Sequence, residues 1–159
     1  MERPKRKNLR LQGYDYSQHG AYFITICTEN KQSLLGYVVG GDDHIAPQTR
    51  LSECGLVVER YLRGIRGIDQ YVIMPNHVHL IVVVESEGGG PMWSSAPTSV
   101  SYRIRSFKTL VTKELGRNIW QRSFYDHVIR DETDYLRIAS YIMENPAKWM
   151  EDPYYVPES

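Results

Sequence analysis

The chain has 159 residues, of which 42% are hydrophobic and 24% charged, the proportions of one ordinary soluble domain with a single core. Its 19 Lys and Arg residues balance its 19 Asp and Glu residues, so any attraction to a polyanion has to come from local patches. No apolar run reaches the roughly 18 residues of a membrane helix, and the polar start of the chain lacks the apolar stretch of a signal peptide. We therefore expect a cytoplasmic protein.

The first segment, residues 1–20, is predicted to be a basic arm ahead of the folded domain. Its charge comes from Arg3, Lys5, Arg6, Lys7 and Arg10 against Glu2. A block of like charges is typical of an arm that contacts a polyanion, and a solvated arm is an equal alternative.

A single domain is expected over residues 21–150. Residues 21–28 combine aromatic and β-branched side chains without a breaker, which predicts a buried strand. The Gly- and Asp-rich stretch after it has room for a short extra strand, and Ser52 is placed to cap a helix of about twelve residues. The two cysteines, Cys27 and Cys54, have no CxxC spacing and are expected to be free, buried thiols.

Residues 69–85 form two apolar runs on either side of Met74-Pro75-Asn76, which predicts a β-hairpin. Residues 86–99 gather Gly, Ser and Pro and predict a loop. A helix over 100–115 is expected to end at Gly116, followed by a strand over 124–129 and a helix over 132–144. Pro146 disfavours helical geometry at Asn145, so we expect the helix to stop there and residues 151–159 to form an extended tail.

The order strand, helix, hairpin, helix, strand, helix predicts an α/β fold of the α+β kind. We expect a mostly antiparallel sheet in a split βαβ arrangement, with the helices packed on one face. A second basic patch lies along the helix over 100–115 and the residues that follow it. This patch comprises Arg103, Arg105, Lys108, Lys113, Arg117 and Arg122 against Glu114.

The pair His77 and His79 is the sharpest local feature. Side chains two apart on a strand point to the same face, so the two imidazoles would lie side by side while Val78 faces the core. Two neutral imidazoles are natural metal ligands, and with oxygen ligands and a phosphate they would accept Mg²⁺ or Mn²⁺. The alternative is a pair of polar residues on the solvent side of an edge strand.

The last helix carries a candidate nucleophile. Tyr135 lies in the apolar stripe of the helix, whereas Tyr141 shares the polar face with Asn145, four residues on. A phenol with a pKa of about 10 is protonated at neutral pH, so it attacks a phosphodiester only where a cation activates the phosphate. The alternative is that Tyr141 packs as an ordinary amphipathic side chain.

These residues occur in segments that resemble the REP-associated tyrosine transposases, within the single-tyrosine HUH endonucleases, where HUH stands for His, hydrophobic, His. The matching segments are RKNLRLQGYDYSQHGAYFITICT, YVIMPNHVHLIV and WQRSFYDHVIRDETDYLRIASYIMENPAKW. His-x-His alone is a weak motif. The combination of Pro-Asn-His-x-His, Trp-Gln-Arg and Tyr-Ile-x-x-Asn-Pro is specific.

The resemblance implies a ferredoxin-like fold and assigns roles to individual residues. His77 and His79 become ligands of Mg²⁺ or Mn²⁺, with Asn145 as a third ligand where related enzymes often have Gln. Tyr141 becomes the nucleophile that forms a 5′-phosphotyrosine link to single-stranded DNA, and the implied partner is DNA with hairpin repeats. Neither a monomer nor a homodimer is favoured.

DNA recognition is expected to use both basic segments for the backbone and exposed aromatics for stacking on unpaired bases. From the first segment these are Arg3, Lys5, Arg6 and Lys7, and from the second Arg103, Arg105, Lys108 and Arg122. Trp93 and Trp120 are candidates for stacking, with a core or loop-anchoring role as the alternative. His127 is expected to pack or to contact a phosphate.

Two further hypotheses compete with a metal-dependent strand transferase. One is a DNA-binding or regulatory protein that grips hairpins on the same fold without turnover, and the presence of all four matched active-site positions argues against it. The other is a replication or conjugation nickase, which the small size and the missing partner domain disfavour.

Overall fold

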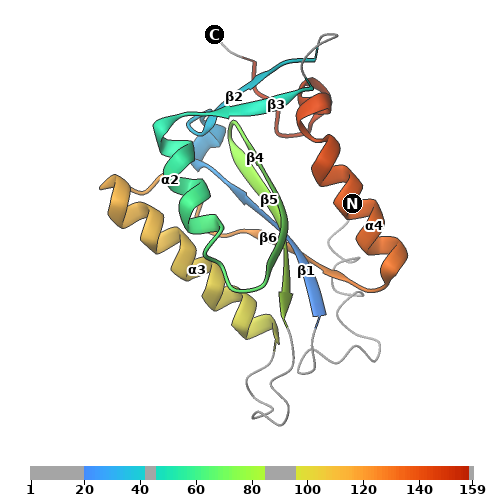
Figure 1. Cartoon of the computed structure of the whole chain (residues 1–159). Coiled ribbons are helices and arrows are strands. Elements are labelled where there is room, and N and C mark those ends of the chain that lie inside the picture. The colour runs from blue at the N-terminus through green and yellow to red at the C-terminus, as the bar shows by residue number, and fades with distance from the viewer. Residues whose placement is uncertain (1–19, 42–45, 85–95, 158–159) are drawn as a thin grey trace.

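The structure is a computed structural model of the chain, and it describes residues 20–41, 46–84 and 96–157 (Figure 1). The predicted basic arm with Arg3, Lys5, Arg6 and Lys7, and also Trp93, lie outside the described residues. Among the described residues, no helix combines the length and the apolar character needed to cross a membrane.

Six strands, three α-helices and two short 3₁₀ helices make up the described fold. In chain order they are β1 (Gly20–Cys27), η1 (Glu29–Lys31), β2 (Gly36–Val39), β3 (Gln48–Leu51), α2 (Glu53–Leu62), β4 (Ile68–Met74), β5 (His77–Val84), α3 (Ala96–Leu115), β6 (Tyr125–Ile129), α4 (Glu132–Glu144) and η2 (Pro146–Glu151).

The main sheet has four strands in the order β4-β5-β1-β6. Strand β1 pairs antiparallel with both β5 and β6, and β4 pairs antiparallel with β5. It follows that β1 and β4 run parallel on either side of β5, while β5 and β6 run parallel on either side of β1. These are two split βαβ units, joined by α2 and α3, and they confirm the predicted α+β fold.

Each face of the sheet has its own hydrophobic core. Tyr22, Ile24, Val78 and Leu80 point to one face and pack with residues of α2 and α3. Ile81 points to the other face, where Ile138 and Ile142 of α4 cover it. Figure 1 shows α4 on the opposite side of the sheet from α2 and α3. The sequence led us to expect all helices on one face of the sheet, and this expectation is wrong for α4.

The helix boundaries follow capping chemistry. Ser52 accepts a hydrogen bond from the backbone N–H of Gly55 at the start of α2, and Asp131 accepts one from Asp134 at the start of α4. Gly116, with φ of +78°, follows the last residue of α3. This left-handed geometry favours glycine because it has no Cβ.

The structure differs from expectation in two connecting regions. Strands β2 and β3 form a separate two-stranded sheet, where the sequence left room for one short extra strand. At the C-terminal end, Asn145 keeps right-handed helical angles and Pro146 begins η2. The tail is not extended, because Tyr155 N–H donates to the Asp152 carbonyl across a turn. This turn brings the tail back onto the sheet.

Candidate active site and metal centre

His77 and His79 lie at the start of β5 on the face of the sheet that α4 covers. Their side chains share this face with Ile81, because every second residue of a strand points the same way. The relative exposures are 0% for His77 and 1% for His79, so the alternative of a solvent-facing pair is wrong. The ring centroids are 4.5 Å apart.

Asn76, the last residue of the hairpin turn, fixes the orientation of the His77 ring. The Asn76 amide nitrogen donates to the backbone carbonyls of Lys31 and Tyr154, which leaves its oxygen to accept from His77 Nδ1 at 2.7 Å. His77 Nε2 is then the unprotonated nitrogen. A ligand whose other ring nitrogen is held in this way is typical of metal sites.

The ring of His79 is held in a similar way, by a residue of the neighbouring strand β1. Its Nδ1 is 2.8 Å from Thr25 Oγ1, and Thr25 lies directly opposite His79 in the β1–β5 register. Its Nε2 faces Tyr141, whose phenolic oxygen is 3.5 Å away. Phe23 packs against both rings, so the site has an apolar wall.

Helix α4 brings Tyr141 and Asn145 to the histidines, whereas Tyr135 lies elsewhere. Tyr141 is 39% exposed, and Asn145 is 3% exposed. The Asn145 side-chain oxygen is buried without a hydrogen-bond partner. Tyr135 donates to Asp69 at 2.5 Å and contributes to the core beneath α4. The polar face and the apolar stripe of this helix are therefore arranged as predicted.

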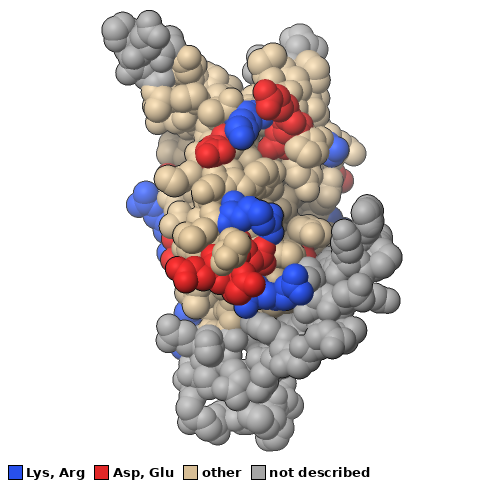
Figure 2. Space-filling view, turned by 90° about the vertical axis from the view of Figure 1, so that its right-hand side faces the viewer, with Lys and Arg blue, Asp and Glu red and all other residues tan. Residues whose placement is uncertain are grey.

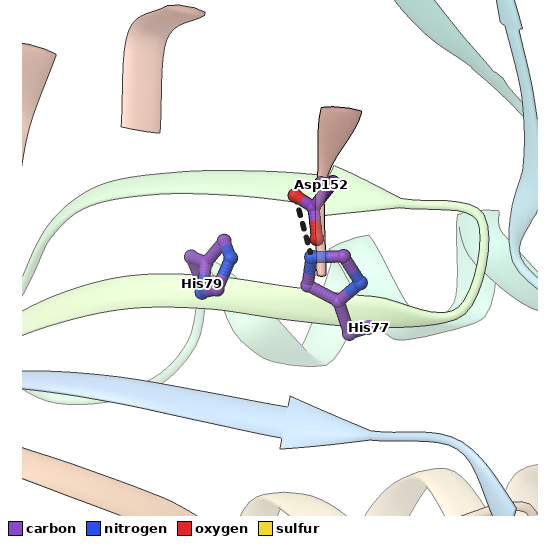
Figure 3. Close-up of side chains that lie close together, drawn as sticks. All are labelled: His77, His79 and Asp152. Atoms are coloured by element: carbon purple, nitrogen blue, oxygen red, sulfur yellow. Dashed lines mark ion pairs between the residues drawn. The ribbon is translucent and has the colours of Figure 1, made fainter. Parts of the chain in front are cut away.

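Asp152 is a further member of the site, one that we did not expect from the sequence. Its Oδ2 is 3.9 Å from His77 Nε2 (Figure 3), while its Oδ1 accepts from the Tyr154 N–H. The Tyr154 ring stacks near His77, with ring centroids 4.5 Å apart. The Asp-Pro pair at 152–153 is a turn signal, and it was the available hint that the tail folds back.

Burial shifts the pKa values of the site in a consistent way. Burial lowers the pKa of His77 to about 3 and lowers the pKa of His79 well below its ordinary value. Burial also raises the pKa of Tyr141 and the pKa of Asp152. Both imidazoles are consequently neutral at physiological pH, as metal ligands must be.

The donor set fits a divalent cation. His77, His79 and Asp152 each offer one ligand atom, and these atoms lie within 4.8 Å of one another. His77 Nε2 and Asn145 Oδ1 are both buried without a hydrogen-bond partner. An unpaired buried polar atom costs about 1–3 kcal/mol, and a cation shared by these atoms would remove that cost. The residues could thus offer a cation two nitrogen and two oxygen ligands.

The second basic patch lies on and beside α3, which is on the opposite side of the sheet from α4 (Figure 1). Arg105, Lys108 and Arg122 line one cavity of about 440 Å³ between α3 and the segment that precedes β6. Arg103 instead donates to the carbonyl of Arg66. Trp120 is 2% exposed and packs on Phe107. It is a core residue, so a DNA base does not reach its ring and the expectation of stacking does not hold for it.

His127 has a local partner on α4. Its Nε2 is 3.1 Å from Asp134 Oδ2, and Arg137 also pairs with Asp134. The face of the molecule that carries α4 mixes acidic and basic side chains (Figure 2). It has the charge pattern of a solvated helix face with local ion pairs.

The sequence is similar to those of known bacterial proteins. No family model matches the sequence. An uncharacterized protein of Haemophilus influenzae is 35% identical, with 95% of this chain and 93% of the relative covered. A REP-associated tyrosine transposase of Escherichia coli is 28% identical over 84% of this chain and 70% of its own length.

One solved structure has a similar fold over most of the chain. It is a REP-associated tyrosine transposase bound to a REP hairpin, with a TM-score of 0.58 and 25% identity, covering 87% of this chain and 73% of that chain.

Proposed function

Because the chain belongs to the family of REP-associated tyrosine transposases, we propose that it cleaves and rejoins single-stranded DNA at hairpin-containing repeats. In this proposal the enzyme is a metal-dependent endonuclease and strand transferase, with Tyr141 as the nucleophile. The observation that carries it is the approach of the Tyr141 phenol to His79 at 3.5 Å, beside three further donor groups.

His77, His79 and Asp152 would hold Mg²⁺ or Mn²⁺, with Asn145 as an additional oxygen ligand. A bound divalent cation supplies Lewis-acid chemistry, because it offsets the negative charge that develops on a phosphate. Asp152 would add a charged oxygen ligand to the three ligands expected from the sequence, without replacing any of them. Hard divalent cations favour such ligands.

The residues of the chain then perform a transesterification. The Tyr141 oxygen forms a bond to the phosphorus, the bond from phosphorus to the 3′ oxygen breaks, and the proton lost from the phenol is balanced by the one that the 3′ oxygen gains. One phosphoester replaces another, so a second 3′ hydroxyl can reverse the step without ATP. Thr25 and Asn76 would hold the two imidazoles in place during both steps.

The test is a covalent adduct. Labelled single-stranded hairpins with their flanks, taken from the DNA beside the protein's own gene, are mixed with the protein and Mn²⁺ or Mg²⁺ and then denatured. We expect a protein–DNA adduct that needs the cation, is lost in Tyr141→Phe and persists in Tyr135→Phe. Tight hairpin binding without any adduct would instead support a binding or regulatory protein.

A further inference from the structure

We propose that single-stranded DNA next to the scissile phosphate follows a basic track around the N-terminal end of β6, from Tyr154 to the outer face of α3. This inference rests on the proposed function and adds to it the route of the strand. The track begins beside the catalytic groups, bends at Lys31 and ends between Lys113 and Arg122.

Three neighbouring hollows make up the track. The first, of about 280 Å³, includes Thr25 and Tyr154 of the site together with Lys31. The second, of about 720 Å³, shares Lys31, Gln121 and Ser123 with the first. The third is the 440 Å³ cavity beside α3, which shares Ser123 with both. The residues around Ser123 thus connect the hollow beside the active site to the cavity that the second basic patch lines.

The cations at the far end of the track lack the partners that other basic residues have. Arg60, Arg63, Arg137 and Lys148 each form an ion pair with a carboxylate. In the part of the chain that the structure describes, Arg105, Lys113 and Arg122 form none, and no Asp or Glu lines their cavity. Unpaired cations in a hollow concentrate positive potential, which favours an anionic ligand.

Lys108 has a different function in the same cavity. Its ammonium group donates to the carbonyls of Gln121 and Arg122, at 2.8 and 3.3 Å. Its charge is therefore partly used in holding the segment before β6 against α3. We assign Lys108 a positioning role, although the sequence led us to group it with residues that contact DNA.

Lys31 connects the track to the active site. It adopts φ of +55° after Asn30 at +58°, a backbone region that non-glycine residues rarely occupy and that is often found at functional sites. Asn76, which orients His77, also holds the Lys31 carbonyl. The Lys31 ammonium lies 5.7 Å from the centre of the Tyr154 ring. This turn therefore places a cation within reach of a phosphate next to the scissile one.

The hollows suit a single strand. Volumes of about 300–1,000 Å³ are those of small-molecule pockets. A hollow of this size accepts a single nucleotide more readily than it accepts a rigid duplex. Aromatic rings lie at the bend, since Phe124 and Tyr125 both line the first hollow and Tyr125 is 46% exposed. Proteins that bind single strands combine a basic groove with such rings. Glu29, in the second hollow, is the one carboxylate among the residues that line the three.

The experiment measures the binding of two labelled probes by fluorescence anisotropy at several salt concentrations. One probe is an oligothymidylate, and the other is a blunt-ended hairpin without a single-stranded flank. The variants are Lys31→Gln, Lys113→Gln and Arg122→Gln. The matched control is Arg50→Gln, which removes one positive charge from β3, away from all three hollows. Thermal unfolding confirms that each variant is folded.

We expect each track variant to weaken oligothymidylate binding several-fold. The slope of log K against log salt should become shallower by about 0.7 for each phosphate that the variant no longer neutralises. Arg50→Gln should leave the slope unchanged.

Unchanged oligothymidylate binding in the variants, or none in the wild type, overturns the track. A weakening confined to the blunt hairpin overturns it as well, because the cations would then bind the stem. The adduct assay is independent: an absent adduct with intact oligothymidylate effects refutes the catalytic proposal alone.

Discussion

The phenolic oxygen of Tyr141 lies 3.5 Å from Nε2 of His79, although 62 residues separate the two in the chain. Strand β5 supplies the imidazole and helix α4 supplies the phenol, and α4 is held on the sheet by Ile138 and Ile142. Because burial lowers the pKa of His79 and raises the pKa of Tyr141, direct proton transfer between them is unfavourable. This arrangement is consistent with activation by a bound cation.

Asp152→Asn tests whether the tail completes the metal site. The substitution keeps the shape of the side chain and removes its charge. A hydrogen bond to a charged group contributes about 1.5–3 kcal/mol, and we take this as the scale for the loss of a carboxylate ligand. We expect the affinity for Mn²⁺, measured by calorimetry, to fall roughly 10-fold or more. Asp126→Asn, on β6, is the matched control. Equal Mn²⁺ affinity in Asp152→Asn and the wild type would exclude Asp152 as a ligand.

Asn76→Ala tests the support of His77. Removal of the amide oxygen that accepts from His77 Nδ1 leaves the ring free to adopt the other tautomer. Removing a group that orients a metal ligand typically reduces metal affinity 10- to 100-fold. Asn118→Ala removes a comparable set of local hydrogen bonds around Trp120 and should leave Mn²⁺ affinity unchanged. A similar decrease in both variants would indicate a general effect on folding.

The buried histidines predict a pH dependence of stability in the metal-free protein. Their folded pKa values lie below the unfolded value of 6.5, and that of His77 is about 3. Between the folded pKa and 6.5, the unfolded state binds more protons than the folded state. The free energy of unfolding therefore rises with pH over this range, and the stability that the neutral rings contribute is lost as pH falls below 6.5. The slope is at most about 1.4 kcal/mol per pH unit for each ring.

Urea unfolding in the presence of a chelator, between pH 5 and 7, measures this dependence. The double variant His77→Gln and His79→Gln should show a flatter dependence than the wild type. Asp152 has a raised pKa and contributes with the opposite sign at lower pH, but it is present in both proteins. Parallel curves for the two proteins would contradict the assignment of neutral, buried rings.

Two glycines separate steric from conformational costs. Gly67 and Gly116 both have positive φ, of +85° and +78°. A Cβ at Gly67 would lie 2.2 Å from the Val83 carbonyl oxygen, whereas a Cβ at Gly116 would meet nothing within 4 Å. We expect Gly116→Ala to destabilise the fold by about 1–2 kcal/mol, the cost of left-handed geometry, and Gly67→Ala to destabilise it clearly more. Equal destabilisation in chemical unfolding would mean that β4 and β5 shift apart easily.

The elements themselves were largely readable from the sequence, because local patterns determine them. Two apolar runs on either side of the Pro75-Asn76 turn predicted the β4–β5 hairpin, and helical spacing with Gly116 predicted the end of α3. The hairpin also implied that His77 and His79 share a face, since the period of a strand is two. The spacing of four between Tyr141 and Asn145 likewise places both on one face of a helix.

Only the tertiary structure decided what meets those faces. Whether β5 presents its histidines to solvent or to a helix depends on strand order and on which face α4 covers, and these follow from packing across the whole chain. The same packing buries Trp120, pairs Tyr135 with Asp69 and folds residues 151–155 back to bring Asp152 to His77. Sequence periodicity specifies which side chains point together, whereas interactions between distant segments, which carry no local signal, determine the site that they form.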